Sequence, residues 1–166
     1  SFGHDIGASW LLGEAAQEAA QEAADGTAPE PRLERARRAS VRMAEVALAE
    51  GFEPSYACDG AEPLPPALAN EVSGPHRDRT RVWWCQAEAL VGFLNAHGLT
   101  EDRRFLDAAA GVRDWIDACQ KDRAGGDWFA QVSAAGVPDL SEPKGGNWKT
   151  GYHNGRCCLE ILTRMG

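Results

Sequence analysis

The chain has 166 residues, of which 43% are hydrophobic, and a formal net charge of −8. This length suits one domain with an apolar core, and the negative charge argues against a nucleic-acid partner, because phosphate backbones are bound by basic surfaces. No apolar run approaches the roughly 20 residues that cross a bilayer, and no secretory leader is visible. We therefore expect no membrane partner and a cytoplasmic location.

Hydrophobic residues recur at helical spacing in five segments. The predicted helices cover residues 9–24, 33–51, 80–96, about 100–119, and a last segment that starts near Tyr152 or His153. Ser9 and Thr100 are expected as N-caps, with residues 25–29 as a turn and His97 followed by glycine as the end of the third helix. The proline-rich residues 53–75 predict a long connection, and residues 128–132 a short strand. The pattern indicates an all-α fold with helices in paired succession.

The cysteines show no metal or disulfide pattern. They are odd in number, and none of them has the CxxC spacing of zinc and redox sites; they are Cys58, Cys85, Cys119, Cys157 and Cys158. We expect free thiols that fill apolar positions.

Two histidines stand near opposite ends of the chain, His4 and His153. Imidazole takes up or releases a proton near neutral pH without an extreme environment, so the two residues are candidates for an acid/base pair. A lone histidine is more often structural, and the neighbouring residues must decide between these readings.

Three separated strings carry a family resemblance. They are Gly3-His4-Asp5-Ile6 with Ser9-Trp10-Leu11-Leu12, then Trp83-Trp84-Cys85-Gln86-Ala87-Glu88-Ala89, and Trp148-Lys149 with Tyr152-His153-Asn154-Gly155-Arg156. In this order they resemble the N-acylglucosamine 2-epimerase superfamily, and within it most of all the cellobiose 2-epimerases. The resemblance implies an (α/α)6 barrel, or toroid, with helices in hairpin pairs. Because such barrels are about twice as long or longer, residues 1–166 are expected to be the C-terminal part of one, without its N-terminal helices.

The resemblance also implies a reaction and a set of site residues. The family inverts C2 of a reducing-end sugar through ring opening and a cis-enediolate, and it uses no metal or organic cofactor. The implied catalytic residues are His4 and His153. The implied substrate-binding residues are Trp10, Trp83, Trp84, Glu88 and Trp148. Core packing of the indoles and an arginine partner for the buried glutamate are the structural alternatives.

Gly7 departs from the family pattern, which has a glutamate three residues after the first histidine to orient its ring. Asp5 points off that helical face and is a doubtful substitute. Three functions therefore stay open besides epimerisation of cellobiose. They are N-acylglucosamine 2-epimerase or mannose isomerase activity, sugar binding by an inactive or partial barrel, and a helical interaction scaffold. The expected partners are a small sugar and either the missing half of the barrel or a second copy.

Overall fold

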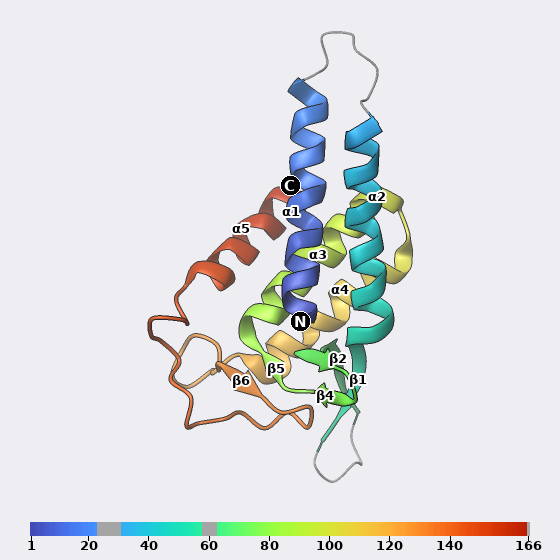
Figure 1. The fold of residues 1–166 in the computed structure, drawn as a ribbon. Helices are drawn as coiled ribbons and strands as arrows, with labels where there is room; N and C mark the ends of the chain where they lie inside the picture. The colour runs from blue at the N-terminus through green and yellow to red at the C-terminus, as the bar shows by residue number, and fades with distance from the viewer. Residues whose placement is uncertain (23–30, 58–62, 166) are drawn as a thin grey trace.

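The computed structural model describes residues 1–22, 31–57 and 63–165, so the turn expected at residues 25–29 lies outside it (Figure 1). Within these ranges the chain is mostly helical. The helices are α1 (Phe2–Glu22), α2 (Pro31–Val46), α3 (Trp83–Thr100), α4 (Arg103–Trp115) and α5 (Tyr152–Met165). Single turns of π-helix, η1 (Ala47–Gly51) and η2 (Ile116–Gln120), extend α2 and α4. None of the described helices is both long and apolar enough to cross a bilayer.

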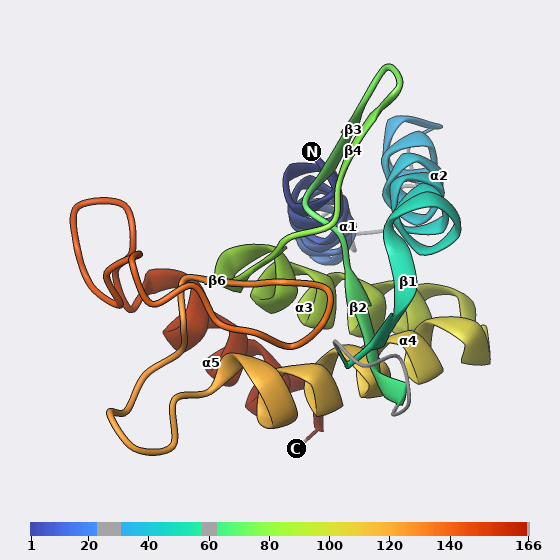
Figure 2. The same ribbon diagram turned by 90° about the horizontal axis from the view of Figure 1, so that it is seen from below.

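Helix α3 is the centre of the fold. It contacts α1, α2, α4 and α5, and Figure 2 shows it between the α1–α2 hairpin and α4. A nearly continuous run of its residues is buried, which matches the broad apolar coverage of the sequence. Gly92 allows α1 to approach closely, because a Cβ there would lie 2.5 Å from Cγ1 of Ile6.

Several predicted boundaries are wrong. Helix α1 begins at Phe2, so Ser9 is a fully buried residue inside it rather than an N-cap. Helix α3 continues past His97, so Thr100 is its last residue rather than the N-cap of the next helix, and Glu101 follows as the C-cap with a φ of 58°. Asp102 then caps α4 by accepting a hydrogen bond from the Arg104 N–H at 2.9 Å.

The segment predicted as a long loop contains strands. β1 (Phe52–Tyr56) pairs with β2 (Pro63–Leu68), and β3 (Glu71–Ser73) pairs with β4 (His76–Asp78). The short strand expected at residues 128–132 is present as β6 (Gln131–Val132), which pairs with β5 (Arg81–Val82). All three sheets have two antiparallel strands. They lie at the end of the molecule where α1 begins, beside the first turn of α3 (Figures 1 and 2).

Candidate active site on three helices

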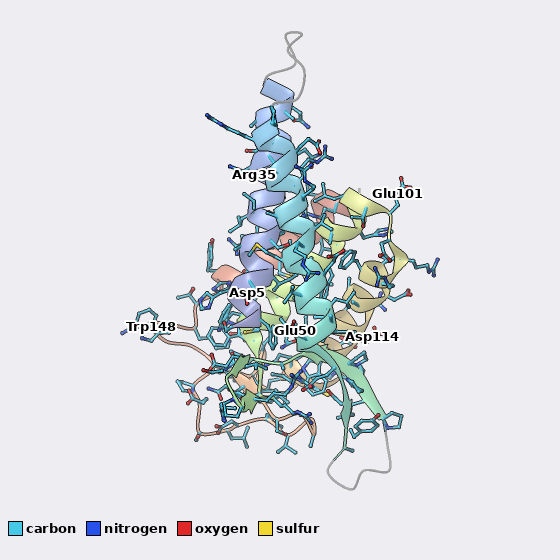
Figure 3. All side chains as sticks on the ribbon, turned by 45° about the vertical axis from the view of Figure 1, so that its right-hand side comes forward. Asp5, Arg35, Glu50, Glu101, Asp114 and Trp148 are labelled. Carbon is cyan, nitrogen blue, oxygen red and sulfur yellow. The ribbon has the colours of Figure 1, made fainter. Side chains whose placement is uncertain are left out.

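The first turn of α1 places His4 at the surface. The Phe2 N–H donates to the carbonyl of Asn70 at 3.1 Å, which holds the start of the helix against the segment before β3. His4 is exposed, and its Nδ1 lies 2.8 Å from the hydroxyl of Ser1. Asp5 is exposed on α1 (Figure 3), and its Oδ2 lies 4.0 Å from the N-terminal nitrogen of Ser1. His4 therefore has a hydroxyl, not a carboxylate, as its hydrogen-bond partner.

The first turn of α3 supplies an indole that lies against both histidines. The ring centroid of Trp84 is 4.7 Å from that of His4 and 5.8 Å from that of His153. His4 and His153, far apart in the sequence, are thus neighbours of the same indole, that of Trp84.

His153 lies in the first turn of α5 and is held by Glu88. Its Nδ1 is 2.7 Å from Oε1 of Glu88. Because the same oxygen also accepts a hydrogen bond from Arg156 at 2.5 Å, the carboxylate acts as the acceptor and the imidazole Nδ1–H as the donor. In the neutral ring the Nε2 atom of His153 then carries no proton.

Glu88 is a buried hub, with 5% of its surface exposed. Besides His153 and Arg156 it accepts a hydrogen bond from the indole Nε1 of Trp10 at 2.8 Å. Three donors from α1 and α5 thus compensate the buried charge. The arginine partner considered as a structural alternative is present, and both carboxylate oxygens have protein donors.

The four tryptophans expected to meet a sugar have different surroundings. Trp10 is 1% exposed, so its ring is part of the core, whereas a sugar-facing indole would need an open face. Trp83 and Trp84 are partly buried, and the ring of Trp83 carries the Lys149 ammonium 5.7 Å from its centroid. Trp148 is 92% exposed and projects from the loop before α5 (Figure 3). Trp148 therefore has the most accessible ring of the four.

Gly7 lies directly against the Glu88 carboxylate. A Cβ at Gly7 would be 3.1 Å from Oε2 of Glu88. The position at which the family pattern has a glutamate is thus one turn from His4 and in contact with the carboxylate that holds His153.

Sequence reasoning did not assign roles to Arg156 and Lys149. Arg156 is three residues after His153 and therefore on the same face of α5, a spacing that is visible in the sequence. Lys149 is 6% exposed and donates to Oδ2 of Asp127 at 3.0 Å, which fastens the start of α5 to the loop after α4. No local pattern signals this second contact.

Two thiols pack near the site. Burial raises the pKa of Cys85 far above its usual range and that of Cys157 to about 12. Both thiols are therefore protonated near neutral pH and act as apolar fillers. Among residues 1–22, 31–57 and 63–165, no three His, Cys, Asp or Glu side chains form a group that could hold a metal ion.

A mostly helical fold that brings two histidines against one indole is compatible with the class of sugar epimerases and isomerases. Residues 2–157 match the family model of N-acylglucosamine 2-epimerase (GlcNAc 2-epimerase). The chain belongs to this family.

Relatives of known activity and structure agree with this assignment. The chain is 36% identical over 165 residues to the cellobiose 2-epimerase of Ruminococcus albus, an alignment that covers 99% of the chain and 38% of that relative. The crystal structure of a sugar epimerase from a ruminal bacterium superposes with a TM-score of 0.82 at 33% identity, over 99% of this chain and 38% of that one. The cellobiose 2-epimerase of Spirochaeta thermophila gives a TM-score of 0.75 at 38% identity, with 99% and 37% covered. The fold thus matches part of an (α/α)6 barrel, and the chain spans 38% of the Ruminococcus albus enzyme.

Proposed function

We propose that this chain is the C-terminal part of a barrel that epimerises C2 of the reducing-end glucose in a β-1,4-linked disaccharide such as cellobiose. The observation that carries the proposal is the contact of both imidazoles, His4 and His153, with the single indole of Trp84. The similarity to cellobiose 2-epimerases supports the choice of substrate.

In the proposed reaction the sugar ring opens and one imidazole removes the C2 proton. The electrons of the C2–H bond form the C1–C2 double bond, and the carbonyl oxygen at C1 takes the negative charge of a cis-enediolate. The other imidazole returns a proton to the opposite face of C2. Substrate and product have the same oxidation level, so the step needs no redox cofactor. Two imidazoles on opposite sides of the substrate can remove and return the C2 proton.

The tryptophans and Glu88 divide the remaining work in this proposal. Trp148 stacks on a C–H face of the sugar, since its ring is exposed, and the partly buried rings of Trp84 and Trp83 contact the sugar from the first turn of α3. Trp10 and Glu88 hold His153 in place, because the Trp10 indole donates to the carboxylate that binds His153.

The test follows solvent hydrogen into the product. Cellobiose is incubated in D2O with the full natural polypeptide that carries this chain, and NMR follows glucosyl-mannose with deuterium at C2. We expect His4→Asn and His153→Asn to abolish the product, while His76→Asn on the exposed strand β4 retains it. Product formation by either site variant at the wild-type rate would contradict the proposed pair.

Mannose and N-acetylglucosamine, offered in the same assay, address the alternative substrates. An aldose–ketose isomerase returns the proton to C1, and the product is then a ketose, which NMR distinguishes from a C2 epimer. A tenfold preference for either monosaccharide over cellobiose would replace the disaccharide proposal.

A sugar-binding role without catalysis is the second candidate. It is favoured by Gly7 and by the openness of the site, in which His4 and Trp148 are both exposed. Calorimetry with cello-oligosaccharides that shows binding, together with no epimer in the NMR assay, would support it. Absence of heat from a folded protein would exclude it.

We also propose that further chain, either the rest of a barrel or a second copy, covers the outer face of α5. Leu159 and Leu162 on this helix are 66% and 70% exposed. Neighbouring exposed leucines of this kind often mark a surface that another chain segment covers. Light scattering of the isolated chain and of the longer polypeptide separates the two partners. A monomeric isolated chain with no tendency to associate would argue against both.

A further inference from the structure

We infer that Arg156 is a positioning residue that fixes the orientation and the tautomer of His153 through Glu88. The inference rests on the proposed function only for its kinetic part. The geometry that carries it lies at the junction of α1, α3 and α5.

The guanidinium of Arg156 lies over two aromatic rings. Its Cζ lies 4.8 Å from the ring centroid of Trp10 and 4.5 Å from that of Tyr152. One nitrogen, Nη1, donates to the hydroxyl of Tyr152, and the other, Nη2, donates to Oε1 of Glu88 at 2.5 Å. The side chain is 21% exposed, so its charge is largely withdrawn from water. Two stacked rings and two hydrogen bonds thus leave the guanidinium with one orientation.

This orientation constrains the Glu88 carboxylate. Arg156 and His153 donate to the same oxygen, Oε1, while Trp10 donates to Oε2. With both oxygens held, the carboxylate cannot rotate, and the plane of the His153 ring follows from its bond to Oε1. Because Arg156 and Trp10 both use the carboxylate as an acceptor, His153 meets it as a donor through Nδ1–H. Nε2 therefore stays available for the substrate.

A lysine would not reproduce this arrangement. Its ammonium is a compact charge on a flexible stem, without the planar fork that fills the space between two rings. If Arg156 were only a structural bridge, its loss would lower stability and leave the tautomer of His153 unchanged. A positioning role predicts a change in the tautomer itself.

The experiment compares Arg156→Lys and Arg156→Met with the wild type in the full natural polypeptide. Long-range ¹H–¹⁵N spectra of the histidine side chains report the tautomer of the neutral ring. We expect Nδ1–H for His153 in the wild type and a mixture of tautomers in both variants. In the epimerase assay we expect kcat to fall about 10- to 100-fold, with KM changed less than twofold.

Arg164→Lys is the matched control. Arg164 also lies over Trp10, at 5.9 Å, but pairs with Glu14 and Glu160 instead of Glu88. We expect it to keep the wild-type tautomer and kcat. If the two Arg156 variants cannot be purified in folded form, Tyr152→Phe removes one partner of the guanidinium and should shift the tautomer in the same direction.

Retention of pure Nδ1–H in the folded Arg156 variants, or in Tyr152→Phe where only that variant folds, would overturn the inference. The spectra decide this point even if the wild type epimerises no sugar, so the positioning role and the proposed function fail separately.

Discussion

Replacing Glu88 with alanine is expected to be among the most destabilising single changes in this chain. The variant leaves three donors without their acceptor, namely the indole of Trp10, the imidazole of His153 and the guanidinium of Arg156. An unsatisfied buried donor costs about 1–3 kcal/mol, and removing one partner of a buried ion pair costs about 3–5 kcal/mol. His153 and Arg156 keep some contact with water, with side chains 29% and 21% exposed. We therefore expect a loss near the ion-pair range, about 3–5 kcal/mol in the free energy of unfolding.

Urea unfolding followed by circular dichroism measures this loss. Glu34→Ala is the matched control, because Glu34 is 48% exposed and pairs with Arg37 and Arg38 at 3.9 and 3.8 Å on the surface of α2. Such pairs contribute about 1 kcal/mol or less. A Glu88→Ala variant within about 1 kcal/mol of the control would refute the description of Glu88 as a buried hub.

Three further substitutions or reactions test other parts of the structure. Gly92→Ala should lower the free energy of unfolding by about 1–3 kcal/mol by overpacking, since its Cβ would lie 2.5 Å from an α1 side chain. Gly98→Ala in the same helix should raise it by roughly 0.5–1 kcal/mol, because the new Cβ would have no atom within 4 Å. Equal effects of the two substitutions in urea unfolding would contradict this. Iodoacetamide at neutral pH should add one label to the tryptic peptide 157–164, on the exposed thiol of Cys158, because burial raises the pKa of Cys157 to about 12; mass spectrometry showing Cys157 labelled first would be the opposite result. Gly7→Glu in the longer polypeptide should raise epimerase turnover by restoring a carboxylate near the first histidine, with Gly7→Gln as a neutral control of the same size. Unchanged turnover in both Gly7 variants would contradict the idea that the missing carboxylate at residue 7 limits the activity of His4.

The sequence predicted the helices of the core and missed how the chain enters them. Ser9 is expected to cap a first helix at residues 9–24, yet α1 starts at Phe2. Gly3 is needed because α3 is close, as a Cβ there would lie 2.5 Å from Sγ of Cys85. Glycine is found both where two helices approach closely and in loops, so a glycine in the sequence does not distinguish the two.

The strands were missed for a different reason. Prolines in residues 53–75 argue against a central strand, but β2, which begins at Pro63, belongs to a two-stranded sheet in which every strand is an edge. The family resemblance of the motif strings predicted that His4, Trp84 and His153 belong to one site. The hydrogen bonds of Glu88 depend on the relative placement of α1, α3 and α5, which no local pattern encodes.

The hydrogen bonds of Glu88 also bear on when the site forms during folding. They join residues separated by 78, 65 and 68 positions in the chain. Closing loops of this length is entropically unfavourable until the intervening helices are in place, so such contacts form late and a fold rich in them has a high contact order. In a chain whose α5 has not docked, the Glu88 carboxylate therefore lacks its donors His153 and Arg156. Native-state hydrogen exchange at α5 would report the opening of the two-histidine site directly.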